Sequence, residues 1–231
     1  MNKTVKVIVE ILLFLACVGL VYAIYSSIMK PVNFNKELKE REEVGIQRLK
    51  DIRTLQVAYK GVYGKFTADP DSLIDFYSNG KMKIIMQVGS ADDSLAWEHT
   101  QKIKKTLKGK NINQQLHAMY DKGDKLLVFS DETEIAVKDT LFNDRPDFTP
   151  SSIKTIPFSD GAPIQMEAEV RTVSGVPVPL FEARMPYKLL LKGMDNQLRI
   201  NLDASRRDQN KYEGLQVGSI TAPNNNAGNW E

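Results

Sequence analysis

The chain has 231 residues, and its 31 lysines and arginines nearly balance 29 aspartates and glutamates, which leaves a net charge of +2. This balance favours neither a nucleic-acid binder nor an acidic tail, and we predict no nucleic-acid partner. The length is sufficient for a membrane anchor and one folded domain whose core needs no disulfide or metal. The only cysteine, Cys17, lies in an apolar N-terminal run, so the remainder of the chain is compatible with an oxidising compartment.

The apolar run covers residues 7–29, and Glu10 is its only charged residue. About 20 apolar residues in a helix cross the roughly 30 Å hydrocarbon core of a bilayer. We therefore predict that residues 1–30 form one transmembrane anchor in the lipid bilayer. A cleaved signal peptide has a shorter apolar region of about 7–15 residues and a small-residue cleavage site, which this run lacks.

A lipoprotein is the alternative interpretation of the same run. The segment Phe14-Leu15-Ala16-Cys17 places a small residue before a cysteine in an N-terminal apolar stretch. However, phenylalanine and leucine fit a lipobox poorly at these positions, and the apolar run continues beyond the cysteine. A buried cysteine in a spanning helix is the preferred interpretation.

The basic residues on the two sides of the span bear on its orientation. Lys3 and Lys6 precede the span, and four basic residues follow it, which by the positive-inside rule slightly favours a cytoplasmic domain. Long domains are translocated largely regardless of such charges, and four glutamates are interleaved with these basic residues. We therefore expect a single-pass protein of the cell membrane whose soluble domain is periplasmic or extracellular.

Residues 31–66 are predicted to form an amphipathic, membrane-proximal helix that continues the transmembrane helix as an almost continuous rod. Pro31 should kink the chain at the bilayer surface, Asn35 could cap the helix start, and Gly61 and Gly64 would end it. The apolar residues recur at spacings of three and four, which is typical of a helix face that packs on a core. That face consists of Ile46, Leu49, Ile52, Leu55, Tyr59 and Val62.

This N-terminal organisation resembles that of type IV pilins and of type II secretion pseudopilins. The resemblance covers roughly the first 75 residues and is one of pattern and order, not identity. It implies a helix that packs against partner helices in an assembly, and a glutamate that pairs with the N-terminal amine of a neighbouring subunit. The residues that carry it are Glu10, Gly19, Pro31, Tyr59, the Gly64-Lys65-Phe66 step and Asp71-Ser72-Leu73-Ile74.

Three positions depart from the family pattern. Val5 stands where the family has the glycine of its processing site, so a prepilin peptidase should not recognise this chain. Pro31 lies about one turn later than the family's proline, and Thr67 replaces a usual proline. For Glu10 the preferred interpretation is that its carboxylate reaches the headgroups beside Lys6 and needs no partner subunit.

Residues 67–219 are predicted to form an α+β head, and residues 220–231 a flexible tail that Trp230 could dock. Helices are expected at 70–77, 94–107 and 113–120. An antiparallel sheet, packed on the amphipathic helix, is expected from later segments, with a hairpin turn at residues 193–196. These segments are 126–130, 134–138, 152–158, 164–170, 176–184, 187–191 and 197–203.

The sequence contains no catalytic motif that we recognise, and we predict no catalytic site, cofactor or metal. His99 and His117 lack a third ligand at metal-binding spacing. The acidic cluster Asp203, Asp208 and Glu213 is a less favoured calcium candidate, suggested by pseudopilins that bind calcium in a C-terminal loop. A lysine run, without aromatic residues to stack bases, is expected to form a solvated helix face: Lys102, Lys104, Lys105, Lys108 and Lys110.

These observations favour a non-enzymatic structural subunit of a cell-envelope assembly, of pilus or secretion type. Its partners would be proteins that contact its N-terminal helices, including further copies of the chain. The residues expected to serve membrane insertion or helix assembly are Glu10, Gly19, Pro31, Leu49, Ile52 and Tyr59. A membrane-tethered ligand-binding module is the second hypothesis, and a membrane-bound enzyme with an unfamiliar site is the third.

Overall fold

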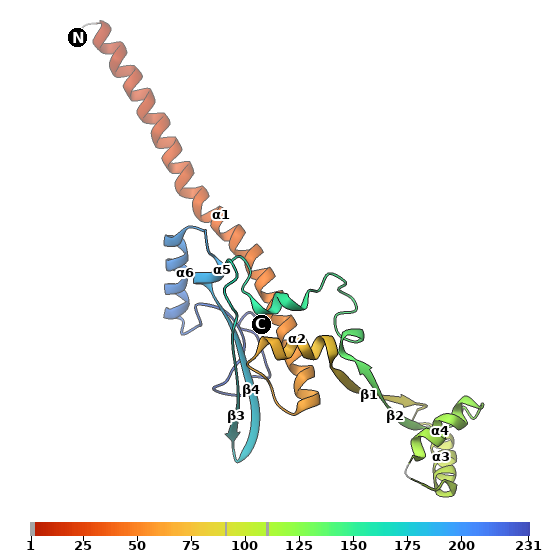
Figure 1. Ribbon diagram of the computed structural model, residues 1–231. Helices are drawn as coiled ribbons and strands as arrows, with labels where there is room; N and C mark the ends of the chain where they lie inside the picture. Colours follow the sequence, from red (N-terminus) through yellow and green to blue (C-terminus); the bar gives the residue numbers. More distant parts are fainter. Residues whose placement is uncertain (1–2, 91, 110) are drawn as a thin grey trace.

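A computed structural model describes residues 3–90, 92–109 and 111–231 of the chain. Figure 1 shows a long helix, α1 (Lys3–Tyr63), whose C-terminal half is embedded in a head of helices and strands. The predicted α+β class is thereby confirmed. The remaining elements are α2 (Pro70–Asn79), β1 (Lys81–Val88), α3 (Ser94–Thr106), α4 (Ile112–Asp121), β2 (Phe129–Ala136), η1 (Val137–Asp139), η2 (Pro150–Lys154), β3 (Gln165–Val173), β4 (Val176–Pro186), α5 (Tyr187–Leu190), α6 (Asn196–Asp208) and β5 (Gly214–Gly218).

Helix α1 is continuous through the predicted anchor and the amphipathic helix, which were expected to form an almost continuous rod. Pro31 lies inside the helix, where it removes one backbone hydrogen bond but does not interrupt the helical backbone. The expectation that Asn35 caps a new helix is therefore wrong. The predicted end is confirmed, because Gly64 follows the last residue with a φ of +73° and its N–H donates to the Lys60 carbonyl at 2.8 Å.

The three short helices that precede the main sheet lie within one or two residues of their predicted bounds. Aspartates cap two of them. The side chain of Asp69 accepts hydrogen bonds from the first turn of α2, and the side chain of Asp93 does the same for α3. Each carboxylate satisfies backbone N–H groups that have no partner inside the helix.

The main sheet is antiparallel, has the order β3-β4-β5, and packs on α1. Ser174 and Gly175, both with positive φ, form the predicted turn between β3 and β4. Phe181, Met185 and Val217 of this sheet are buried in one cluster with residues of α1. The predicted packing of a sheet face on the amphipathic helix is confirmed.

A second, two-stranded sheet was not predicted. Strand β1 lies between two of the predicted helices, where no strand was expected, and it pairs with β2 across an intervening pair of helices. In Figure 1 this ribbon carries α3 and α4 at the end of the molecule away from the N-terminus. The two helices and the ribbon enclose their own small cluster around Leu116, Leu127 and Phe129. The prediction of one sheet is therefore wrong.

Three further segments that were predicted as strands have other structures. Residues 187–191 contain α5, residues 197–203 lie in α6, and residues 152–158 overlap the 3₁₀ helix η2. The expected hairpin turn at 193–196 instead joins two helices, because the Asp195 carboxylate accepts hydrogen bonds from the N–H groups of Gln197 and Leu198. An aspartate in this position begins a helix.

The C-terminal residues make specific contacts with the head. Trp230 packs against the main core, and Gly228 bridges to Val217 of β5. The Asn229 side chain accepts a hydrogen bond from the Gln216 N–H, and Glu231 pairs with Arg53 of α1 at 2.7 Å. The segment predicted to be flexible from its composition is thus attached to both β5 and α1 in this structure.

Candidate membrane and assembly surface

The N-terminal part of α1 has no protein around it. Every described side chain in residues 6–25 is exposed, and Ser26 is the first to be partly covered. Glu10 is among the exposed residues, and a Cβ atom on Gly19 would meet no atom within 4 Å apart from its chain neighbours and the adjoining backbone of its own helix. Most of this surface is apolar, and Leu12, Leu13, Phe14 and Leu20 are each at least 60% exposed. A water-soluble protein rarely exposes an apolar surface of this extent.

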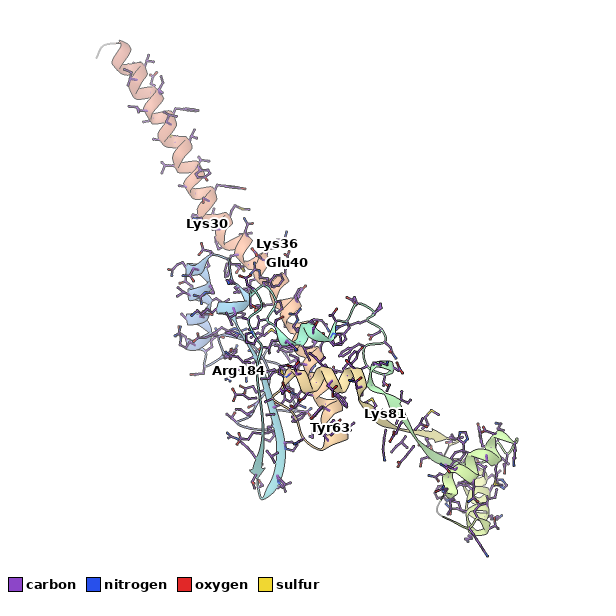
Figure 2. The ribbon with its side chains drawn as sticks, viewed as in Figure 1. Lys30, Lys36, Glu40, Tyr63, Lys81 and Arg184 are labelled. Atoms are coloured by element: carbon purple, nitrogen blue, oxygen red, sulfur yellow. The ribbon has the colours of Figure 1, made fainter. Side chains whose placement is uncertain are left out.

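The head first meets α1 at a groove of about 550 Å³. One side of the groove is α1 from Tyr22 to Pro31, and the other is the start of α6, with Asp195, Gln197 and Leu198. Pro31 is half-buried at this junction. In Figure 2 the labelled Lys30 lies where the bare part of α1 reaches the head. The polar loop before α6 thus lies beside the last turns of the apolar run.

The C-terminal half of α1 is the centre of the head core. Leu49, Ile52 and Leu55 have no exposed surface, as their spacing predicts, whereas Val62 is 41% exposed. The Tyr59 ring contacts the rings of Tyr63 and Phe76 at centroid distances of 4.5 and 5.4 Å. The six residues expected to serve insertion or assembly are therefore spread along α1 and do not form one site. Leu49 and Ile52 bind the helix to its own head.

Buried polar contacts fix the rotation of α1 in the head. Arg145 donates two hydrogen bonds to the Asp51 carboxylate, at 2.6 and 2.9 Å, and this bonding raises the pKa of the Arg145 guanidinium. The Gln56 side chain is fully buried and bonds both the N–H and the carbonyl of Thr67. Such directional contacts specify one register of the helix against the loops that surround it.

A second polar network joins α1 to α5 and α6. The Tyr187 hydroxyl donates to the Glu42 carboxylate and accepts a hydrogen bond from Arg206 at 2.6 Å. Burial raises the pKa of the Tyr187 hydroxyl well above its usual range, so this group stays protonated. Arg41 donates to the carbonyls of Leu190, the last residue of α5, and of Lys192. Through Arg206 and Tyr187, the C-terminal end of α6 is held at the level of Glu42.

Most of the candidate ligand residues are paired with other side chains, and Asp208 is an exposed residue at the C-terminal end of α6. His99 contacts Asp124 at 2.8 Å, and His117 contacts Asp121 at 3.0 Å. In the acidic C-terminal cluster, Arg199 pairs with Asp203 at 2.5 Å, and Arg207 pairs with Glu213 at 3.1 Å. Within the part of the chain that the structure describes, no three His, Cys, Asp or Glu residues are grouped to hold a metal ion.

The lysine run lies at the C-terminal end of α3 and in the loop beyond it. Lys102, Lys105 and Lys108 are exposed and Lys104 is half-buried, while Lys110 lies outside the described residues. The buried face of this helix carries Ala96 and Thr100, and the Thr100 hydroxyl accepts a hydrogen bond from the Val128 N–H at 2.8 Å. The lysines therefore lie mainly on the solvent side of α3.

Two adjoining grooves lie between α1 and β1. Their volumes are about 700 and 410 Å³, and Val57, Ala58 and Met82 line both. Phe66 and Leu141 add apolar surface to the larger groove, and lysines of β1 border the smaller one. These grooves offer apolar contact with a charged rim, which suits binding of a ligand or a peptide segment.

A functional assignment rests on the division of α1 into two halves. The N-terminal half is apolar and exposed, and the C-terminal half is fixed in the head. This division was visible in the sequence as a change from a continuous apolar run to a periodic pattern. The junction of α1 with α6 was missed, because residues 193–203 were assigned to a turn and a strand. Comparison with known proteins gives no match to a protein-family model, a curated protein or a solved structure.

Proposed function

We propose that this protein is a non-enzymatic, membrane-anchored structural subunit of a cell-envelope assembly. The single observation that carries the proposal is the exposure of α1: every described side chain in residues 6–25 is exposed, whereas Leu49, Ile52 and Leu55 have no exposed surface. A helix with these two environments requires an apolar medium for one half and its own head for the other. The lipid bilayer and neighbouring helices both provide such a medium.

The dimensions of the apolar run support a spanning helix. One stretch of α1 is long and apolar enough to cross a membrane, and none of that stretch is buried in the head. At about 1.5 Å per residue, residues 7–29 extend roughly 34 Å, which is comparable with the thickness of the hydrocarbon core. The helix continues without a break into the head, so movement of the membrane segment would be transmitted to it.

The arrangement also supports assembly through α1. The sequence resembles that of pilins and pseudopilins over this region, and Gly19 leaves open surface at which another helix can approach closely. Glu10 is an ionisable residue in an apolar run, a position that is costly in lipid and favours a partner. We place the head outside the cytoplasm, in the periplasm or at the cell surface.

Intact-mass measurement with N-terminal sequencing, on protein from its native membrane, tests the anchor. A chain that starts at Met1 supports an uncleaved span. A chain shortened to near Lys6 would instead identify a processed, pilin-like subunit, and a lipid-modified Cys17 would identify a lipoprotein. Crosslinking in the same membranes tests assembly, and the absence of any crosslinked partner would contradict the structural-subunit proposal.

A membrane-tethered binding module is the second candidate, and the grooves between α1 and β1 favour it. Under this proposal the grooves bind an envelope ligand while α1 only holds the head at the membrane. Replacing Ala58 by tryptophan would fill both grooves without reaching the span. Loss of the cellular function with unchanged crosslinking through the N-terminal helices would favour the binding module over the structural subunit.

A further inference from the structure

The level at which the head meets α1 sets a limit on how far the helix can enter the bilayer. By sequence alone the apolar run continues to Met29, so the hydrocarbon would be expected to end there. The exposure of α1 gives a different limit, because the head begins to cover the helix at Ser26. Hydrocarbon chains cannot surround a helix where protein already covers one of its sides.

The part of the head that covers this region is polar. We call residues 193–198, which join α5 to α6 and form the first turn of α6, the α5–α6 turn. Asp195, Asn196 and Gln197 are exposed within it, and Asp195 and Gln197 face the stretch of α1 from Tyr22 to Pro31. Even with the hydrogen bonds that the Asp195 carboxylate accepts from the N–H groups of Gln197 and Leu198, a carboxylate and side-chain amides are costly to place in hydrocarbon, so this turn belongs in a hydrated layer.

The residues of α1 at the same level suit the lipid headgroups. Tyr22 and Tyr25 are exposed aromatic residues of the kind enriched at membrane interfaces, and Lys30 is exposed one to two turns later. Ser26 and Ser27 interrupt the apolar run between them. If the hydrocarbon ends at Tyr25, residues 7–25 extend about 28 Å, which matches a bilayer core of roughly 30 Å.

Helix α6 leads away from this level along α1. Its N-terminal turn lies beside residues 22–31, whereas Arg206 near its C-terminal end bonds Tyr187, which in turn bonds Glu42. Glu42 lies 16 residues after Ser26, or about 24 Å along the helix axis. One end of α6 is therefore near the membrane and the other is well outside it.

We propose that the α5–α6 turn rests in the lipid headgroup layer and that the hydrocarbon ends at Tyr25 of α1. The partner of this surface is the headgroup region of the phospholipid bilayer, and the contact sets the depth at which the anchor stops. This inference rests on the proposed membrane insertion of α1 and adds the surface of the head that touches the membrane.

Fluorescence quenching in vesicles tests the inference on the full-length chain. Single cysteines replace Gln197, Gln209 or Val18 in a Cys17→Ser background, and each is labelled with nitrobenzoxadiazole. Gln197 and Gln209 are exposed at opposite ends of α6, so they form a matched pair. The vesicles contain phosphatidylcholine and phosphatidylglycerol, with a nitroxide either on the headgroup or midway along the acyl chain.

We expect headgroup nitroxide to quench the label at position 197 but not at 209, and acyl-chain nitroxide to quench the label at 18. If 18 is quenched but 197 is as unaffected as 209, the anchor is correct and the inference about the turn is wrong. Equal quenching of 197 by both nitroxides would place the turn in hydrocarbon and overturn the stated boundary. Quenching of 209 as well as 197 would mean that α6 lies flat, which also overturns it. Failure to quench 18 would reject the anchor itself.

Discussion

The two halves of α1 form one unbroken helix, yet they differ in the pattern and in the exposure of their apolar residues. Over residues 6–25 nearly all side chains are apolar and all that are described are exposed. Over the second half, apolar residues recur at three- and four-residue spacing, and Leu49, Ile52 and Leu55 are buried. A continuous apolar surface suits a medium that surrounds the helix, whereas a stripe suits a core on one side. The pattern of apolar residues thus indicates whether a helix is surrounded by lipid or packs on a protein core.

The largest expected effect comes from placing charge in the first half. Leu15→Arg together with Val18→Arg should prevent stable insertion, because each arginine near the centre of a span costs about 3 kcal/mol on insertion scales. The measurement is the fraction of protein that stays with membranes after alkaline carbonate extraction. Ile85→Arg with Leu126→Arg is the matched control, since these residues are also exposed and apolar but lie in the head. If both variants were lost from the membrane to the same extent, the assignment of the first half of α1 to the bilayer would be wrong.

Removing a buried side chain from the second half should destabilise the head instead. Leu49→Ala is expected to lower the free energy of unfolding by about 2–5 kcal/mol, through lost burial and the cavity that remains. Val57→Ala is the control on the same helix, because Val57 is 49% exposed. Denaturant unfolding in detergent measures both, and membrane association should stay unchanged. A head that tolerates Leu49→Ala would show that α1 is not part of its core.

The C-terminal contacts join the second half of α1 to β5 and should therefore contribute to the stability of the head. Trp230→Ala should lower the free energy of unfolding by about 2 kcal/mol, less than for a fully buried tryptophan, since Trp230 is only half-buried. Hydrogen exchange should become faster in residues 224–231 and in β5. An unchanged exchange pattern would instead support the flexible tail that the sequence predicts.

The smallest effect is expected at Asp203 in α6. Burial raises the pKa of this carboxyl above its ordinary 3.8, although Arg199 acts against the shift. A raised folded-state pKa favours folding below pH 3.8, and that contribution is lost as the pH rises through the raised value. Asp203→Asn should therefore gain stability relative to the unmodified chain as the pH rises to neutral, by less than about 1 kcal/mol.

Urea unfolding at pH 3.5 and pH 7 measures this difference, with Asp208→Asn as the control. Asp208 lies at the exposed end of the same helix. If the two variants respond equally to pH, the burial of Asp203 has no energetic consequence for the head.

The elements that were predicted correctly are those marked by a local sequence signal, such as a capping or turn residue. Asp69 and Asp93 cap helices directly ahead of them, and Ser174-Gly175 provides the positive φ angles of a tight hairpin turn. The segments that it assigned wrongly have ambiguous local patterns. Residues 197–203 alternate well enough for a strand, although Asp195 as a cap and the four-residue spacing of Leu198 and Leu202 are typical of a helix.

The apolar run, the buried face of α1 and the α+β class can be predicted from the amino-acid sequence, because each follows from the spacing of apolar residues or from a single capping or turn residue. The pairing of β1 with β2 and the level at which α6 meets α1 are known only from the folded structure. Both depend on segments far apart in the chain: β1 and β2 are separated by two helices, and Asp195 lies beside Tyr22 and Ser26. Contacts of this kind result from packing of the whole head, which no local pattern specifies.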